Sequence, residues 1–155
     1  MSDIDHAKAM LQLASQDLNA VKGMLDTEVF VDNIFGFHVQ QAIEKSLKAW
    51  ISALSGTYPN IHDIEELIEI LKGLNCDVDG LEIYVEYNPF AVQFRYTEYD
   101  SIEEPLNRND TIHKVQASAC LRISNLCCAV KRSLLPFVIT SGSGITSVRT
   151  TGKAG

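Results

Sequence analysis

The stretch NRNDTIHK, residues 107–114, brings together residue types that can cleave RNA without a metal ion. Arg108 and His113 stand five positions apart, and the polar Asn109 directly follows the arginine. A neutral imidazole, with a pKa of about 6.5, can take the proton of an RNA 2′-hydroxyl. A guanidinium can stabilise the charge on the phosphate. The same letters also suit an ordinary helix start, with Asn109 or Asp110 as the N-cap and His113 on a flank.

A second group of polar residues lies earlier in the chain and follows a helical spacing. Its members share one face of a predicted helix, beside the apolar side: His38, Gln41, Lys45 and Lys48. Two lysines and a histidine in a line can hold a phosphate or a carboxylate. His38, Lys45 and Lys48 are therefore candidate nucleotide-binding residues. A solvated helix face explains the same pattern.

Charge is divided unevenly along the chain. The net charge is −7, but residues 1–105 hold 6 basic and 19 acidic residues, whereas residues 106–155 hold 7 basic residues and 1 acidic residue. The basic segment could bind phosphates, with Lys114 among its candidate contacts, if its last helix gathers these side chains. Pairing with acidic helices of the same fold or of a partner is the alternative.

The composition indicates one water-soluble domain. A chain of 155 residues with 46% hydrophobic content can bury a sizeable core. We see neither a signal peptide nor an apolar run of about 18 residues, which a membrane span requires, so we expect a cytoplasmic protein. The four cysteines form no CxxC pair, and the sequence offers no sign of a metal site or a cofactor.

Apolar residues recur at steps of three and four in four segments, which predicts four long amphipathic helices. These segments cover residues 4–25, 32–54, 60–74 and 109–134. Asn60 is the expected N-cap of the third helix, and one short helical turn is expected between the third and the last helix. The prediction is an all-α, up-and-down bundle of four to five helices over residues 1–137, with a flexible glycine-rich tail at 138–155.

Residues 37–71 carry a longer pattern, FHVQQAIEKSLKAWISALSGTYPNIHDIEELIEIL. This segment resembles the signature of the HEPN family (higher eukaryotes and prokaryotes nucleotide-binding domain). In proteins of this family, the next helix opens with Pro-x-x-His-Asp. This motif is preceded, in order, by Phe-His, Gln-Gln-Ala, Glu-Lys and Leu-Lys-Ala. The resemblance extends over about residues 5–134 and implies a helical bundle, in agreement with the periodicity.

The resemblance also bears on the first motif. Ribonucleolytic HEPN proteins carry an Arg, a polar residue and then a His at the start of the last long helix, which Arg108, Asn109 and His113 match. The family solution is a homodimer that pools two such pairs in one cleft, without a metal ion. The resemblance implies either a toxin-like endoribonuclease paired with a minimal nucleotidyltransferase or a non-catalytic nucleotide- or RNA-binding subunit of such a pair. Toxin members commonly have an adenylylated Tyr two residues after the His, where this chain has Val115.

Two residues of the HEPN-like segment call for structural partners. Glu44, if it faces inward, needs a partner such as Arg95 or Lys48, because an unpaired buried carboxylate is costly. His62 stands just before Asp63 at the predicted helix start. We expect it to support the helix entry or an interhelical hydrogen bond.

Overall fold

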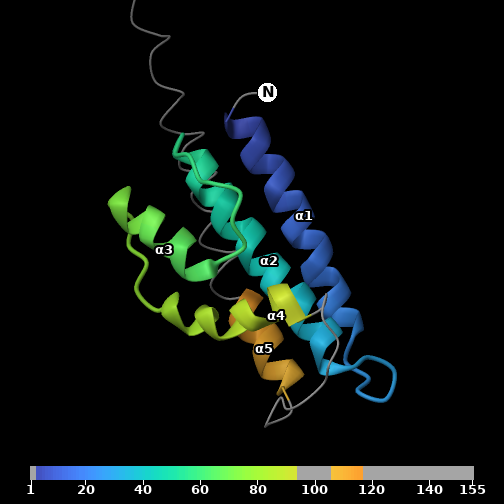
Figure 1. Ribbon diagram of the computed structural model, residues 1–155. Coiled ribbons are helices and arrows are strands. Elements are labelled where there is room, and N and C mark those ends of the chain that lie inside the picture. The colour runs from blue at the N-terminus through green and yellow to red at the C-terminus, as the bar shows by residue number, and fades with distance from the viewer. Residues whose placement is uncertain (1–2, 94–105, 117–155) are drawn as a thin grey trace, which may run out of the picture.

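The computed structural model describes residues 3–93 and 106–116, with the side chains of 92 and 93 outside the description. Two long helices dominate it. Helices α1 (Asp3–Gly23) and α2 (Asp32–Ala53) lie side by side and run in opposite directions, joined by a short connection (Figure 1). The start and end of α2 agree with the sequence prediction.

Four shorter elements follow along the chain: α3 (Ile64–Gly73), the 3-10 helix η1 (Glu82–Tyr87), α4 (Asn88–Gln93) and α5 (Arg108–Val115). Helices α3, η1 and α4 pack against α2, whereas α5 contacts α1. Helix α5 lies at the same end of the molecule as the α1–α2 connection (Figure 1). The described residues contain no strand, so the predicted all-α bundle is confirmed. No helix among these residues is long and apolar enough to cross a membrane.

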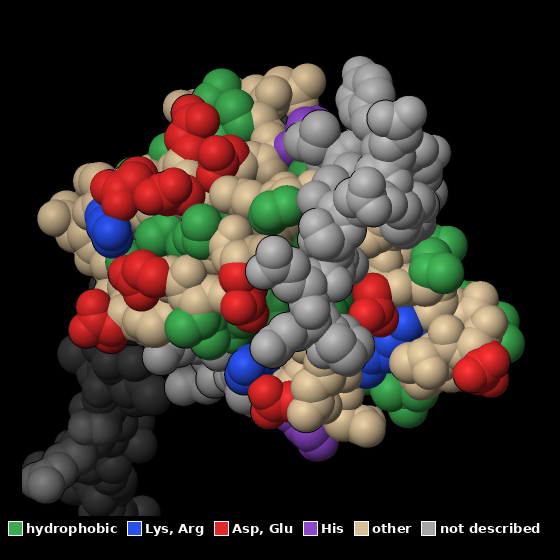
Figure 2. All heavy atoms as spheres, turned by 60° about the horizontal axis from the view of Figure 1, so that its bottom comes forward, with side chains coloured by type: hydrophobic (Ala, Val, Ile, Leu, Met, Phe, Trp, Pro, Cys, Tyr) green, Lys and Arg blue, Asp and Glu red, His purple; other side chains and the backbone are tan. Residues whose placement is uncertain are grey.

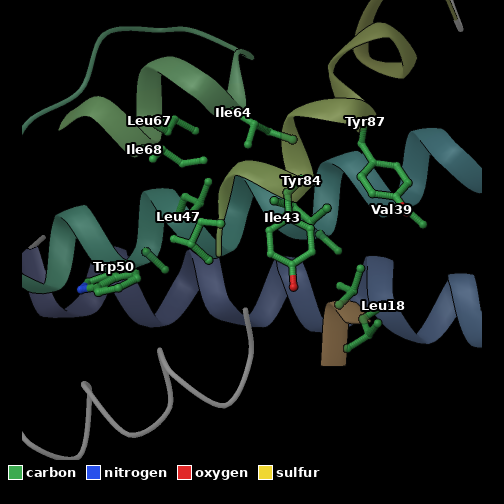
Figure 3. Close-up of a cluster of buried hydrophobic side chains, with 14 of the residues drawn as sticks. Leu18, Val39, Ile43, Leu47, Trp50, Ile64, Leu67, Ile68, Tyr84 and Tyr87 are labelled. Carbon is green, nitrogen blue, oxygen red and sulfur yellow. The ribbon is translucent and has the colours of Figure 1, made fainter. Parts of the chain in front are cut away.

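The core forms around α2, which contributes apolar side chains to each of its neighbours. Ile43 and Leu47 of α2 face Leu67 and Ile68 of α3, with Tyr84 of η1 alongside (Figure 3). The Tyr84 hydroxyl donates a hydrogen bond to the Lys114 carbonyl at 2.9 Å, which ties η1 to α5. The last turn of α5 is therefore held from the core side.

Gly36, within α2, permits a close approach of α4. A Cβ atom placed there would lie 2.4 Å from the Phe90 ring, closer than real Cβ contacts. The absence of a side chain lets Phe90 pack against the α2 backbone. The cost of a glycine in a helix, about 1 kcal/mol relative to alanine, is offset by this aromatic contact.

Two helix starts differ from the prediction. Helix α3 begins at Ile64 and not near Asn60, because Asp63 is the N-cap and accepts hydrogen bonds from the backbone of Glu65 and Glu66. The predicted cap was therefore wrong by three residues. Helix α5 begins at Arg108, and its N-cap is Asn107, whose side chain accepts from the Asp110 amide at 3.2 Å. The proposed caps Asn109 and Asp110 lie inside the helix.

The predicted short turn before the last helix corresponds to η1 and α4. The remainder of the predicted last helix, residues 117–134, lies outside the described residues, as does the tail at 138–155. The domain limits at 1–137 remain a prediction.

Candidate functional site

Arg108 lies at the first position of α5 and is almost completely enclosed. Its side chain is 4% exposed, and all five N–H donors are used. Nε and Nη2 donate to one carboxylate oxygen of Asp32, at 3.2 and 2.6 Å. Nη1 donates to the carbonyls of Met24 and Asp26, and Nη2 also donates to that of Phe30. We call this set of contacts the Arg108 clasp.

The Arg108 clasp fastens the α1–α2 connection to the start of α5. The second carboxylate oxygen of Asp32 accepts from the Leu106 amide at 3.2 Å, and the guanidinium lies 5.0 Å from the centre of the buried Phe35 ring. Asp32 thus holds both the arginine and the chain that precedes it. In this single chain, a phosphate could reach Arg108 only after some of these bonds had opened. The predicted phosphate contact of Arg108 remains a prediction.

His113 has the opposite environment. Its side chain is exposed, and no hydrogen bond joins its ring to another described residue. Asn109, four residues earlier, is also exposed and lies on the same side of α5, because residues four apart are neighbours on a helix. Asn109 and His113 are therefore free to meet a ligand.

Lys114 lies next to His113 and is exposed. It forms an ion pair with Asp110 at 3.0 Å, and this hydrogen bond raises the pKa of Lys114 above its ordinary value. Both side chains are about half exposed. A solvent-exposed ion pair of this kind contributes little stability, so a phosphate can displace Asp110 at little cost.

The structure divides the predicted stripe on α2 between two sets of contacts, and His38 and Lys45 share one carboxylate of α1. Asp17 of α1 accepts from Lys45 at 2.6 Å and lies 2.9 Å from Nδ1 of His38. Because an ionised carboxylate only accepts, His38 donates through Nδ1. His38 and Lys45 thus join α2 to α1, which accounts for their helical spacing without a ligand. Their nucleotide-binding role remains a prediction.

Lys48 belongs to a separate, buried network centred on Glu44. Lys48 donates to Glu44 at 2.8 Å and to the Ile61 carbonyl at 2.6 Å, and the side chains of the pair are 8% and 4% exposed. Gln40 donates to Glu44 and to the His62 carbonyl. Nδ1 of His62 lies 3.2 Å from both oxygens of Glu44. We call this set the Glu44 network.

The Glu44 network explains most of the HEPN-like signature in physical terms. It holds the segment before α3 against α2, and Asp63 then caps α3 while it accepts from Asn88 at 2.8 Å. Of the two partners expected for Glu44, Lys48 is confirmed, whereas Arg95 lies outside the described residues. His62 reaches Glu44 of α2 from the segment before α3, so its expected structural role is confirmed, although the bond does not join two helices. Much of this signature therefore builds the fold.

Two aspartates essential to these arrangements were missed by the sequence analysis. Asp32 is 76 positions from Arg108, and Asp17 is 28 positions from Lys45. Asp32 could only be recognised as a helix-start residue. Asp17 lies between polar residues and the apolar Leu18, which gives no local sign that its carboxylate turns toward α2.

The arrangement defines an antiparallel helical bundle with an exposed histidine on α5. A family model described as HEPN domain matches residues 7–132. The chain belongs to the HEPN domain family. Neither the curated proteins nor the solved structures gave a match.

Proposed function

We propose that this HEPN-domain protein is a metal-independent endoribonuclease, active in the cytoplasm as a homodimer. The observation that carries the proposal is the exposed His113, whose ring is bonded to no other described residue, with Asn109 beside it on α5. Support also comes from the fit of Arg108, Asn109 and His113 to the motif of ribonucleolytic family members.

The reaction requires two imidazoles. A neutral ring takes the proton from the 2′-hydroxyl while the 2′-oxygen attacks phosphorus. The bond from phosphorus to the 5′-oxygen breaks, and a protonated ring gives its proton to that leaving oxygen. The products are a 2′,3′-cyclic phosphate and a 5′-hydroxyl, so atoms and charge balance. One His113 cannot fill both roles at once, and the second copy's His113 supplies the other.

Arg108 has a different role in this proposal from the phosphate contact that its position in the motif suggests. Its donors are used by Asp32 and three backbone carbonyls, so we assign it as a positioning residue that fixes the first turn of α5. Lys114 is the cation available to the scissile phosphate, because its partner Asp110 is exposed and easily displaced. Asn109 can donate an amide hydrogen bond to a phosphate oxygen.

A toxin-like role beside a minimal nucleotidyltransferase is part of the same proposal and rests on the family resemblance. The alternative is a non-catalytic nucleotide- or RNA-binding subunit of the same kind of pair. The full occupation of Arg108 favours this alternative, because the motif then offers no guanidinium to the phosphate. The two functions share a partner but differ in RNA cleavage.

The proposed function is tested by RNA cleavage in EDTA. We expect the wild type to cut RNA, His113→Ala to lose at least about a hundredfold in rate and Asn109→Ala to lose less. His6→Ala is the matched control, because it removes an imidazole near the start of α1, at the end of the molecule opposite α5 (Figure 1).

Urea unfolding of each variant shows whether a loss reflects chemistry or folding. A wild type that leaves RNA intact would support the non-catalytic subunit. Equal cleavage by the wild type and His113→Ala would place the activity elsewhere. A cyclic phosphate end on the cleaved RNA is the product expected for two imidazoles acting as base and acid.

A further inference from the structure

An open cavity lies at the end of the molecule opposite α5, between the start of α1 and the connection that follows α2 (Figure 1). Its volume is about 460 Å³, within the range of small-molecule sites. The polar side chains that line it come from α1, α2 and the connection: Asp3, His6, Ser52, Thr57, Tyr58 and Asn60. None of them belongs to the motif at the start of α5, so the cavity is a separate candidate binding site.

Tyr58 supplies the largest aromatic side chain that lines the cavity. Its hydroxyl lies 2.8 Å from Nε2 of His6, and the two rings stack with their centres 6.3 Å apart. Nζ of Lys48 lies 5.4 Å from the centre of the Tyr58 ring, so this ring already accepts one cation, whose charge Glu44 balances. These contacts from α1 and α2 hold the Tyr58 ring in place before any ligand binds.

Asp3 carries the charge of the cavity lining. Apart from a histidine, it is the one titratable acid or base among the lining residues that is charged at neutral pH, and no hydrogen bond or ion pair joins its carboxylate to another described residue. Helix α2 ends beside the cavity and has no basic residue in its last turn. The partial negative charge of this helix end is therefore uncompensated within α2, which favours a cation nearby. Asp3 and the end of α2 together attract positive charge to the cavity.

The face formed by α3 and η1 adds to this negative potential. Residues 63–86 expose eight acidic residues and one lysine, and acidic side chains gather on that side in Figure 2. The end of α3 reaches the cavity at Gly56, where a Cβ atom would lie 2.8 Å from Cδ1 of Leu74, the C-cap of α3. A field of one sign attracts ligands of the opposite sign. Phosphates, and with them nucleotides and RNA, are therefore disfavoured in this cavity.

We propose that this cavity binds a small organic cation with one ammonium group, either primary or quaternary. The Asp3 carboxylate supplies the counter-charge, and the Tyr58 ring supplies a cation–π contact. One carboxylate in the lining matches one positive charge on the ligand. The hydroxyl of Thr57 and the amide of Asn60 can form hydrogen bonds with a polar substituent of the same ligand. The site is independent of His113 and of the proposed nuclease activity.

The test is isothermal titration calorimetry of the full chain with choline and with ethanolamine, which carry a quaternary and a primary ammonium group beside a hydroxyl. We expect at least one of these amines to bind, and to bind at least about tenfold more tightly than its uncharged analogue, in which carbon replaces nitrogen. Asp3→Asn and Tyr58→Leu should each weaken binding at least about fivefold. Tyr58→Phe should stay within about twofold of the wild type, because it keeps the ring.

Asp26→Asn is the matched control, because it removes an exposed carboxylate from the α1–α2 connection, at the other end of the molecule, and changes the net charge equally (Figure 1). It should bind the amine like the wild type. Urea unfolding ensures that the variants are folded, and two lining positions keep the test valid if one variant fails to fold. The inference is overturned if neither amine binds or if the uncharged analogue binds equally well. Binding that is unchanged in both Asp3→Asn and Tyr58→Leu, or weakened as much in Asp26→Asn as in Asp3→Asn, also overturns it.

Discussion

The Glu44 network and the Arg108 clasp solve the same structural problem with different consequences. Each uses a buried cation and a carboxylate of α2 to hold a connection through backbone carbonyls. Lys48 and Gln40 bind the carbonyls of Ile61 and His62, whereas Arg108 binds three carbonyls of the α1–α2 connection. In the Glu44 network, the ring of His62 lies within hydrogen-bond distance of the Glu44 carboxylate. At the Arg108 clasp the nearby histidine, His113, is left exposed.

This difference separates the side chains that stabilise the fold from those that remain exposed and could contact a ligand, although both belong to one family signature. Nδ1 of His62 is held by Glu44, and Lys48 is buried, so the first region uses its polar groups internally. The second region uses its arginine internally but leaves His113, Asn109 and Lys114 at the surface. A family motif can therefore contain both kinds of residue, and burial and bonding tell them apart.

The largest effect is expected for Arg108→Ala. It leaves Asp32 and three carbonyls without their donor, and we expect a loss of about 4 kcal/mol in the free energy of unfolding, measured with urea. A stable Arg108→Ala protein that lost RNA cleavage would instead favour direct phosphate binding. Arg108→Lys should restore only part of the stability, because an ammonium cannot reproduce the forked contacts.

Lys48→Met should have the second-largest effect, a loss of about 3 kcal/mol in the free energy of unfolding. Methionine fills the space but leaves the Glu44 carboxylate buried without its cation. The double variant with Glu44→Gln should recover part of this loss, because a neutral amide needs no counter-charge. A Lys48→Met protein as stable as the wild type would mean that Glu44 is neutralised by other means.

The N-caps of α3 and α5 should also differ in how much their removal lowers the free energy of unfolding. Asp63→Ala removes bonds to Glu65, Glu66 and Asn88, so we expect a loss of about 1.5 kcal/mol in unfolding free energy. Asn107→Ala removes one bond at 3.2 Å and should cost about 0.5 kcal/mol. Urea midpoints of both variants test the order, and a reversed order would show that α5 depends more on its cap than its contacts indicate.

The smallest change in stability is expected for His113→Ala, within about 0.5 kcal/mol of the wild type. His62→Ala should cost more, about 1 kcal/mol, because it removes a hydrogen bond from a buried carboxylate. Cleavage should show the reverse order, with activity lost in His113→Ala and kept in His62→Ala. Comparison of unfolding and RNA cleavage for this pair tests directly which histidine is structural.

Local patterns in the sequence predicted much of the fold and part of the candidate site. The apolar periodicity predicted α1, α2 and most of α3, and Lys48 was one of the two partners, with Arg95, expected for an inward-facing Glu44. The helix start before His113 was predicted to within one residue. These features depend on neighbours along one helix, and the sequence contains them in full.

Tertiary structure decided what local pattern could not. Asp63, and not Asn60, caps α3 because the carbonyls of Ile61 and His62 are held by donors on α2. Arg108 is enclosed because carbonyls from a distant connection converge on it, and carbonyls carry no side-chain identity that a sequence could display. The sequence by itself determined the helices and the position of His113 in the chain. Only the packing of the α1–α2 connection against α5 decided that Arg108 is buried while His113 remains exposed.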